Sequence, residues 1–345
     1  MTQGLPSRPK ILYAFQGTGN GHSARASKLV PELRRLAQVD VLCSGLNRQL
    51  ELDFDIDYQY QGISFEYNSK GGLSYSKTFL KNKLNRFSKD IRGLDLDSYD
   101  LILNDFEPVS AWAAKKSKTR IIGIGHQAAF LSEKTPRPPK KNPFAEWVFR
   151  NYAPVEEYIG FHFKSYDEGI YGAILRDEII KARPVQGDYM LCYLPAYSNA
   201  DIFEVLSKVS NKQWYIYSKE SQIPEQKMNC HFKPISGDAF MGDLIGAEGL
   251  LCSAGFEAPA EAIYLGKKLM VVPIQGQYEQ VCNAEALRQV GVPVIHKLST
   301  RNLSLIQNWV YEEQDLEVEV IEDLGSWLQK QDLFKLKLDI NRLAL

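Results

Sequence analysis

The stretch Gly249–Ala284 constrains the fold of this chain more than any other part of the sequence. A short apolar run at Leu250–Cys252 predicts a buried strand, and apolar residues recur at helical spacing over Phe256–Leu265. Gly266 is expected to end this helix, and Leu269–Ile274 predicts a second buried strand. A strand–helix–strand unit of this kind is typical of a doubly wound α/β sheet.

The turn between this strand and helix is built from the small residues Ser253, Ala254 and Gly255, and it leads into Phe256. A helix that begins directly after a strand points its free N–H groups and the positive end of its dipole outward, where they bind a phosphate or diphosphate. Glu261 lies further along the same helix, where its carboxylate can accept hydrogen bonds from two vicinal hydroxyls, as on a ribose. We therefore predict a nucleotide site on this helix.

Five elements keep a fixed spacing: Gly255, a carboxylate six residues later, Gly266, Pro273 and the polar segment Gln277–Asn283. This pattern resembles the nucleotide-sugar site of GT-B glycosyltransferases, above all the peptidoglycan N-acetylglucosaminyl transferase (family 28) and the UDP-glycosyltransferase superfamily (family 1). The resemblance implies an α/β fold of two doubly wound Rossmann-like domains that face each other across a cleft. The alternative is a helix that carries a glutamate by chance, because Gly-to-Glu spacings are common.

The resemblance also assigns further side chains to the sugar-nucleotide donor. Glu279 and Gln280 are expected to hydrogen-bond hydroxyls of the sugar, and Gln275 and Gln277 to share that work. In the family, the loop before the preceding helix packs against the nucleotide base. Phe240 is therefore expected to contact the base, and a place in the core is the alternative.

A glycine-rich loop follows the first apolar run, Lys10–Gln16, which predicts the first strand; Ser23–Gln38 predicts an amphipathic helix that Pro31 kinks. The loop consists of Gly17, Thr18, Gly19, Asn20, Gly21 and His22. It lacks the third glycine of a dinucleotide fingerprint and the Lys-Ser/Thr of a Walker loop. It is similar to the first loop of the family-28 enzyme, Gly-Gly-Thr-Gly-Gly-His, which implies that it lies against the acceptor or the diphosphate.

His22 is the expected general base, since a neutral imidazole accepts a proton from a hydroxyl near neutral pH. A base of this kind is usually oriented by a carboxylate. Asp105, at the end of the apolar run Tyr99–Leu103, is the candidate, and plant members of the superfamily carry an aspartate at the corresponding strand end. The alternatives are a structural role for His22 and a helix-capping role for Asp105 before Val109–Lys116.

A further strand is predicted at Thr119–Gly125, and His126 and Gln127 follow it. In the family-28 enzyme a His-Glu-Gln cluster follows the equivalent strand and lines the acceptor side. The resemblance therefore implies that His126 and Gln127 help to bind the acceptor.

Charge and cysteine content argue against several classes of protein. Lysine and arginine total 41 against 42 acidic residues, so no overall charge favours a nucleic-acid partner. Five scattered cysteines without a C-x-x-C pair predict reduced core thiols in a cytoplasmic protein and no zinc site. The D-x-D patterns at 53–57 and 95–97 fit a solvated strand face and a polar turn. We therefore expect no metal, and no cofactor besides the UDP-sugar substrate.

Two basic stretches, 77–86 and 134–141, lie close to aromatic residues. Such segments bind anionic membrane surfaces, or they form an ordinary helix face and a solvated Pro-rich loop. The first possibility places the protein at the inner face of the membrane through peripheral contact. The N-terminal residues lack the apolar core of a signal peptide, and no run of about 18 apolar residues is present.

The length of 345 residues predicts two domains. The strand at Tyr158–Lys164 is expected to be the last of the first domain, and Ala182–Pro184 the crossing to the second, because Asp188–Leu194 begins a new buried strand. We predict an acceptor-side domain over 1–183, a nucleotide-sugar domain over 184–315 and terminal helices over 316–345 that cross back to the first domain, as in GT-B folds.

The predicted function is inverting transfer of a sugar from UDP-GlcNAc or a UDP-hexose to a hydroxyl acceptor, lipid-linked or glycan, in cell-envelope or polysaccharide synthesis. Two alternatives stay open. One is a sugar-nucleotide 2-epimerase of the same fold, and the other is a non-catalytic subunit that binds the sugar nucleotide.

Overall fold

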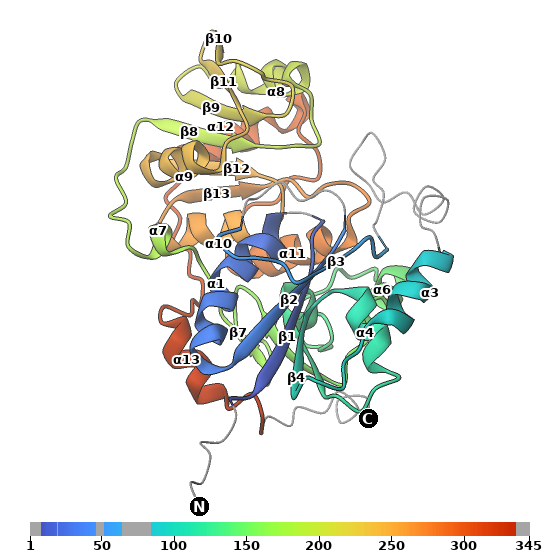
Figure 1. The fold of residues 1–345 in the computed structure, drawn as a ribbon. Helices are drawn as coiled ribbons and strands as arrows, with labels where there is room; N and C mark the ends of the chain where they lie inside the picture. The colour runs from blue at the N-terminus through green and yellow to red at the C-terminus, as the bar shows by residue number, and fades with distance from the viewer. Residues whose placement is uncertain (1–7, 19, 46–51, 64–83, 336–345) are drawn as a thin grey trace, which may run out of the picture.

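The computed structural model describes residues 8–18, 20–45, 52–63 and 84–335. The chain forms two lobes, each built around its own mainly parallel sheet with helices on both faces (Figure 1). This is the predicted GT-B arrangement of two Rossmann-like domains.

The first sheet is parallel throughout, and its strands stand in the spatial order β3-β2-β1-β4-β5-β6-β7. Their bounds are β1 Lys10–Gln16, β2 Gln38–Ser44, β3 Tyr58–Tyr60, β4 Leu101–Asp105, β5 Ile121–Gly125, β6 Glu157–Phe161 and β7 Ile170–Tyr171. Because β1 and β4 are neighbours, with Phe15 paired to Asp105, the loop after β1 and the end of β4 meet at one edge of the sheet.

The second sheet has the order β10-β11-β9-β8-β12-β13, and only the β10–β11 pair is antiparallel. The bounds are β8 Tyr189–Tyr193, β9 Gln213–Ser218, β10 Glu225–Lys227, β11 Cys230–Pro234, β12 Gly249–Cys252 and β13 Lys268–Val271. The donor-site unit predicted from the sequence is β12, the helix α10 at Glu257–Tyr264, and β13.

The remaining helices connect these strands. In the first lobe they are α1 Asn20–Leu36, α3 Leu84–Gly93, α4 Pro108–Ala114, α5 His126–Ala129 and α6 Pro143–Asn151, and a short helix, α7 Asp177–Ile180, lies in the linking segment. In the second lobe they are α8 Asn199–Leu206, α9 Gly237–Gly246, α11 Tyr278–Gln289, the 3₁₀ turn Thr300–Asn302 and α12 Leu303–Trp309, followed by α13 Leu324–Gln331. None of the described helices is long and apolar enough to cross a membrane.

Two expected boundaries are wrong. The helix after the glycine loop begins at Asn20 rather than Ser23, so His22 lies within its first turn. The strand β7 follows β6, so the strand near Tyr158 is not the last of its sheet. A two-residue strand such as β7 is too short to show a periodic pattern in the sequence.

The C-terminal segment returns to the first lobe, where α13 lies beside α1 (Figure 1). The ring of Trp327 packs against Phe161 and Tyr171, with centroids 5.7 and 5.0 Å apart, and the Tyr171 hydroxyl donates a 2.8 Å hydrogen bond to Gln331. Helix α13 therefore covers apolar surface of the first sheet.

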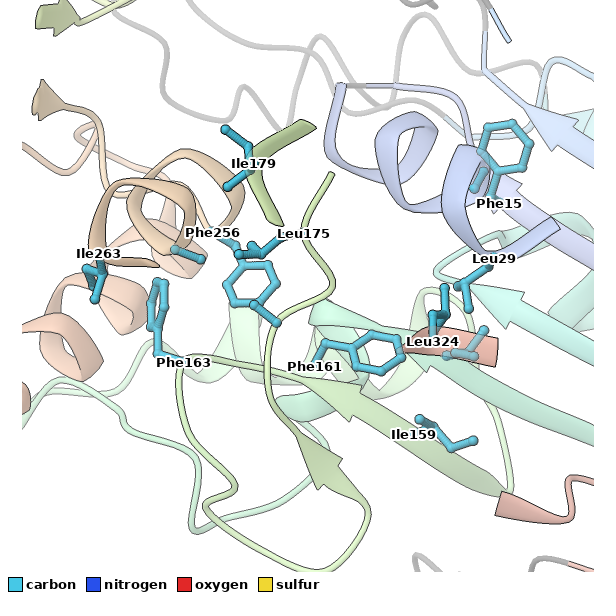
Figure 2. Packing of buried hydrophobic residues seen from close by; sticks show 14 of the residues in the cluster. Phe15, Leu29, Ile159, Phe161, Phe163, Leu175, Ile179, Phe256, Ile263 and Leu324 are labelled. Carbon is cyan, nitrogen blue, oxygen red and sulfur yellow. The ribbon is translucent and has the colours of Figure 1, made fainter. Parts of the chain in front are cut away.

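The apolar core is continuous between the lobes. Figure 2 shows Phe163, which follows β6, beside Phe256 at the start of α10, and their ring centroids are 5.2 Å apart. Leu175 and Ile179 of the linking segment belong to the same buried cluster. This packing between the two lobes positions α10 relative to the first sheet. All five cysteines are buried and free, in agreement with the predicted core thiols.

Candidate functional site

A cavity of about 330 Å³ lies between the two lobes. The first lobe contributes the start of α1, the turn after β4, and the helices α5 and α6, and the second lobe contributes the starts of α10 and α11. Ten residues that were predicted to bind donor or acceptor or to act as base line it: Thr18, Gly21, His22, His126, Gln127, Gly255, Phe256, Gln277, Glu279 and Gln280.

The structure brings His22 and Asp105 into direct contact. Nδ1 of His22 lies 2.9 Å from Oδ1 of Asp105, and the aspartate side chain is fully buried. With Nδ1 directed at the carboxylate, Nε2 is the ring nitrogen that remains to accept a proton from a substrate.

Asp105 does not cap the helix that follows it, so that alternative is wrong. The cap of α4 is Glu107, whose carboxylate accepts hydrogen bonds from the backbone N–H groups of Val109 and Ser110 at 2.7 and 2.6 Å. Burial raises the pKa of Glu107 above its usual value, although these hydrogen bonds act in the opposite direction. Since another carboxylate fills the capping position, Asp105 is left to face His22.

Two residues with unusual backbone conformations lie next to Asp105. Phe106 has φ of 55°, a left-handed conformation that costs a non-glycine residue about 1–2 kcal/mol. Gly125, at the end of β5, has φ of 151°, and a Cβ there would lie 2.4 Å from Oδ1 of Asp105. The glycine thus makes room for the aspartate carboxylate.

Arg25 is a site residue that the sequence analysis missed. Its guanidinium donates to both oxygens of Asp105, at 2.8 Å from Nε to Oδ2 and 3.0 Å from Nη2 to Oδ1. Nη1 also lies 3.2 Å from Oε1 of Glu257 in the second lobe. Burial by itself would raise the pKa of Asp105, but the positive charge of Arg25, aided by His22, outweighs it and keeps that pKa below its usual value. The sequence signal that could have revealed Arg25 was its spacing from His22, because residues three positions apart lie on the same face of a helix.

His126 and Gln127 both connect the lobes. The His126 ring stacks on Phe256 with centroids 4.1 Å apart, Nε2 lies 3.0 Å from the Asn283 amide oxygen, and Gln127 donates to Glu279 at 3.1 Å. Burial lowers the pKa of His126, and the nearby Glu279 only partly offsets this. A neutral, fully packed His126 is suited to stabilising the contact between the two lobes.

Glu261 lies outside the residues that line the cavity. Both of its oxygens accept hydrogen bonds from Arg176, from Nε and from Nη2, each at 2.7 Å. Burial raises the pKa of Glu261, and the hydrogen bonds from Arg176 act against that rise. A ribose at this carboxylate would have to share it with the arginine.

Other predicted donor residues also lie away from the cavity lining. Ser253 and Ala254 lie in the β12–α10 turn just before Gly255, which is the first residue of that turn to line the cavity. Gln275 is exposed, and Phe240 packs edge-on against Tyr193 and Tyr217. Glu257, which was not predicted, lines the cavity instead. It lies only two residues after Gly255, in the first turn of α10.

The glycine loop is described except for Gly19, which lies outside the described residues. Gly17 is buried, and its N–H donates to the carbonyl of Ser44 at 2.6 Å. A Cβ at Gly21 would lie 2.6 Å from Oε1 of Glu257, so the first turn of α1 closely approaches α10. Asn20 begins α1.

An apolar wall on the first lobe was also missed. It combines Phe106 and Tyr152, whose ring centroids are 4.8 Å apart, with Phe144, Val148 and Phe149 of α6. In the sequence, these residues of α6 appear only as aromatic and apolar residues after a basic stretch. That they line a cavity was therefore not predictable.

Of the two basic stretches, the structure describes all of 134–141. Residues 77–83 lie outside the described residues. In the stretch 134–141, Lys134 pairs with Asp167 at 2.6 Å and Lys141 with Glu133 at 3.0 Å, while Arg137, whose side chain is only 4% exposed, pairs with Glu146 at 2.7 Å. Much of this charge is therefore used within the protein.

The described residues contain no group of three or more His, Cys, Asp or Glu side chains that could hold a metal ion. In the 53–57 pattern, Asp57 accepts a 2.7 Å hydrogen bond from the backbone N–H of Val41. In the 95–97 pattern, Asp95 accepts from the N–H of Asp97 at 3.0 Å. These carboxylates shape the local backbone.

Two Rossmann-like lobes, with a cavity between them that is lined by His22 and backed by the buried Asp105, are the arrangement of the GT-B class. The chain belongs to the glycosyl transferase family 1 group Glyco_trans_1_3, whose sequence profile matches residues 9–312.

Solved structures share this fold. MurG of Acinetobacter baumannii superposes with a TM-score of 0.61 at 13% identity, over 93% of this chain and 99% of that one. UGT2 of Phytolacca americana, complexed with UDP-2-fluoro-glucose and pterostilbene, gives a TM-score of 0.58 at 14% identity, over 99% and 94% of the two chains. A UDP-N-acetylglucosamine 2-epimerase gives 0.53 at 14% identity, over 89% and 88%. No curated protein matches the sequence.

Proposed function

We propose that this glycosyltransferase moves a sugar from a UDP-sugar to a hydroxyl acceptor with inversion at the sugar carbon. The observation that carries the proposal is the 2.9 Å contact between His22 and the buried Asp105 at the wall of the cavity between the lobes. A binding module has no need of a base held in this way.

In the proposed reaction, the neutral His22 donates its Nδ1–H to Asp105 and receives the acceptor proton at Nε2. The acceptor oxygen attacks the anomeric carbon from the face opposite the diphosphate. The bond from that carbon to the phosphate oxygen breaks, and UDP leaves with the electron pair. Asp105 stabilises the imidazolium that forms.

The donor belongs on the second lobe. The N–H groups at the start of α10, beside Gly255, point toward developing negative charge on the leaving diphosphate. A Cβ at Gly255 would meet no protein atom within 4 Å, so this backbone is open to a ligand. Gln277, Glu279 and Gln280 line the same side and are proposed to bind the sugar. The UDP-2-fluoro-glucose in the similar UGT2 structure supports a UDP-sugar donor.

The acceptor belongs on the first lobe, in front of His22. The wall formed by Phe106, Phe149 and Tyr152 favours an acceptor with an apolar part next to its hydroxyl, as a lipid-linked or glycan-lipid molecule has. Such an acceptor would require contact with a membrane surface at the inner face, in cell-envelope or polysaccharide synthesis.

The test is to incubate the protein with UDP-GlcNAc, UDP-glucose or UDP-galactose, with and without a lipid extract or soluble alcohols, and to measure free UDP. Release of UDP that depends on an acceptor supports transfer. Interconversion of the UDP-sugars supports the epimerase alternative, for which the similar 2-epimerase fold gives a precedent. Binding without turnover supports a non-catalytic subunit.

A further inference from the structure

The reaction proposed above leaves the buried guanidinium of Arg25 without a role. Its side chain is only 5% exposed, and it donates to both oxygens of Asp105. Nη2 also lies 3.3 Å from Nδ1 of His22. A full positive charge therefore stands beside the nitrogen through which the base is held.

This placement matters because a histidine paired only with a carboxylate is biased toward its protonated form. An imidazolium cannot accept the acceptor proton. The charge of Arg25 neutralises that of Asp105, and it repels an imidazolium at His22. The carboxylate then orients the ring through its Nδ1–H, and the charge of Arg25 opposes a second proton at Nε2.

The other titratable groups around this cluster leave that balance in place. The Tyr13 ring of β1 lies close to Asp105 and Arg25, and burial raises the pKa of its hydroxyl well above the usual value, so Tyr13 stays neutral. Glu257 of α10 pairs with Arg25, but its side chain is 35% exposed and solvent weakens its effect. His126 of α5 is neutral, and Glu279 of α11 is directed at His126 and Gln127.

We propose that Arg25 is a positioning residue for the base: it fixes the Asp105 carboxylate in the orientation that holds His22, and its charge disfavours a second proton on the imidazole. The inference rests on the proposed role of His22 as base. The Arg25–Glu257 contact also ties this arrangement to the donor lobe, because Glu257 begins the helix proposed to hold the diphosphate.

Gly125 gives independent support. A Cβ at this position would collide with Oδ1 of Asp105 and would also lie 3.3 Å from Nε of Arg25. The backbone at the end of β5 thus leaves space for the aspartate and the guanidinium together.

The test follows the titration of His22 by NMR in protein labelled at histidine Cε1. The chain has only five histidines, so His22→Ala identifies the signal. In Arg25→Met the midpoint should move to higher pH by about 1–3 units, the usual effect of a nearby charge. Arg25→Lys loses the bidentate hydrogen bonding to Asp105 but keeps the positive charge, so it should leave the midpoint close to wild type.

Lys28→Met is the matched control, because Lys28 lies three residues further along the same helix and pairs with Asp177 at the surface. It removes the same charge and should leave the midpoint of His22 unchanged. A wild-type midpoint in folded Arg25→Met would overturn the inference.

Arg25→Met leaves Asp105 buried without its partner, so a second comparison is needed if that variant does not fold. Asp105→Asn should move the midpoint to lower pH, and Arg25→Met/Asp105→Asn, which removes both charges, should return it toward wild type. A double variant that titrates like Asp105→Asn alone would show that the charge of Arg25 does not act on His22. Undiminished UDP release by His22→Ala would instead refute the proposed function, whatever the NMR shows.

Discussion

The replacement Glu261→Ala separates a donor-binding role of this carboxylate from a purely structural one. The Glu261 side chain is only 5% exposed, and Arg176 grips both of its oxygens at 2.7 Å. Arg176 precedes α7 in the segment that links the lobes, so the pair ties this segment to α10.

Each role predicts its own magnitude. Breaking a buried ion pair by removing one partner costs about 3–5 kcal/mol. Arg176 is 29% exposed and can rehydrate, so we expect the lower end, about 3 kcal/mol, in the free energy of unfolding of Glu261→Ala. A charge-assisted hydrogen bond to a ribose adds about 1.5–3 kcal/mol to binding, so the donor-binding role predicts that UDP affinity also falls, roughly tenfold to over a hundredfold.

Urea denaturation and titration calorimetry with UDP measure the two effects. Arg176→Met is the matched control, because it breaks the same pair but keeps the carboxylate. If Glu261 binds ribose, Arg176→Met loses stability and retains UDP affinity, whereas Glu261→Ala loses both. An unchanged dissociation constant for UDP in folded Glu261→Ala would remove this residue from the donor site.

Three further predictions follow from the geometry. Gly125→Ala places a Cβ 2.4 Å from Oδ1 of Asp105 at a φ of 151°, so it should displace the carboxylate that holds His22, and the folded variant should lose turnover; a fully active Gly125→Ala would show that the position of Asp105 does not matter for the reaction. Burial lowers the pKa of both His126 and His162 below the ordinary 6.5, so on acidification these histidines take up protons in the unfolded chain before they do in the folded protein. The free energy of unfolding should therefore fall as the pH drops below about 6.5, by about 1.4 kcal/mol per pH unit for each histidine until its folded pKa is reached. Urea midpoints that do not change between pH 7 and 5 would contradict this. Activity should persist in excess EDTA, because the N–H groups at the start of α10 are proposed to stabilise the leaving diphosphate; loss of activity that Mn²⁺ or Mg²⁺ restores would contradict the metal-free reaction.

The sequence was informative where a pattern is local and repeated. The β12–α10–β13 unit was predictable because apolar runs and helical spacing mark buried elements directly, and its observed bounds differ from the predicted ones by at most three residues. The contact between His22 and Asp105 was predictable for a similar reason. Both residues follow or end strands of one parallel sheet, and such strand ends meet at the same edge.

Other parts of the site depend on which side chains meet across the two lobes, and no local pattern encodes that. Arg25 stood one helical turn from His22, but only the approach of α10 shows that it also reaches Glu257. Glu261 fits the family spacing, yet its partner Arg176 lies 85 residues away in sequence. The wall from α6 follows a basic stretch that carries no sign of facing a cavity.

The central claim is that His22 is the base of a glycosyl transfer. The most direct measurement compares wild type and His22→Ala for UDP release, with the UDP-sugar and acceptor that give the highest wild-type turnover, and for UDP affinity by calorimetry. We expect turnover to fall by roughly a hundredfold or more, the usual share of a positioned base, with UDP affinity unchanged because the nucleotide is held by the other lobe. Wild-type turnover in a folded His22→Ala protein would contradict the account.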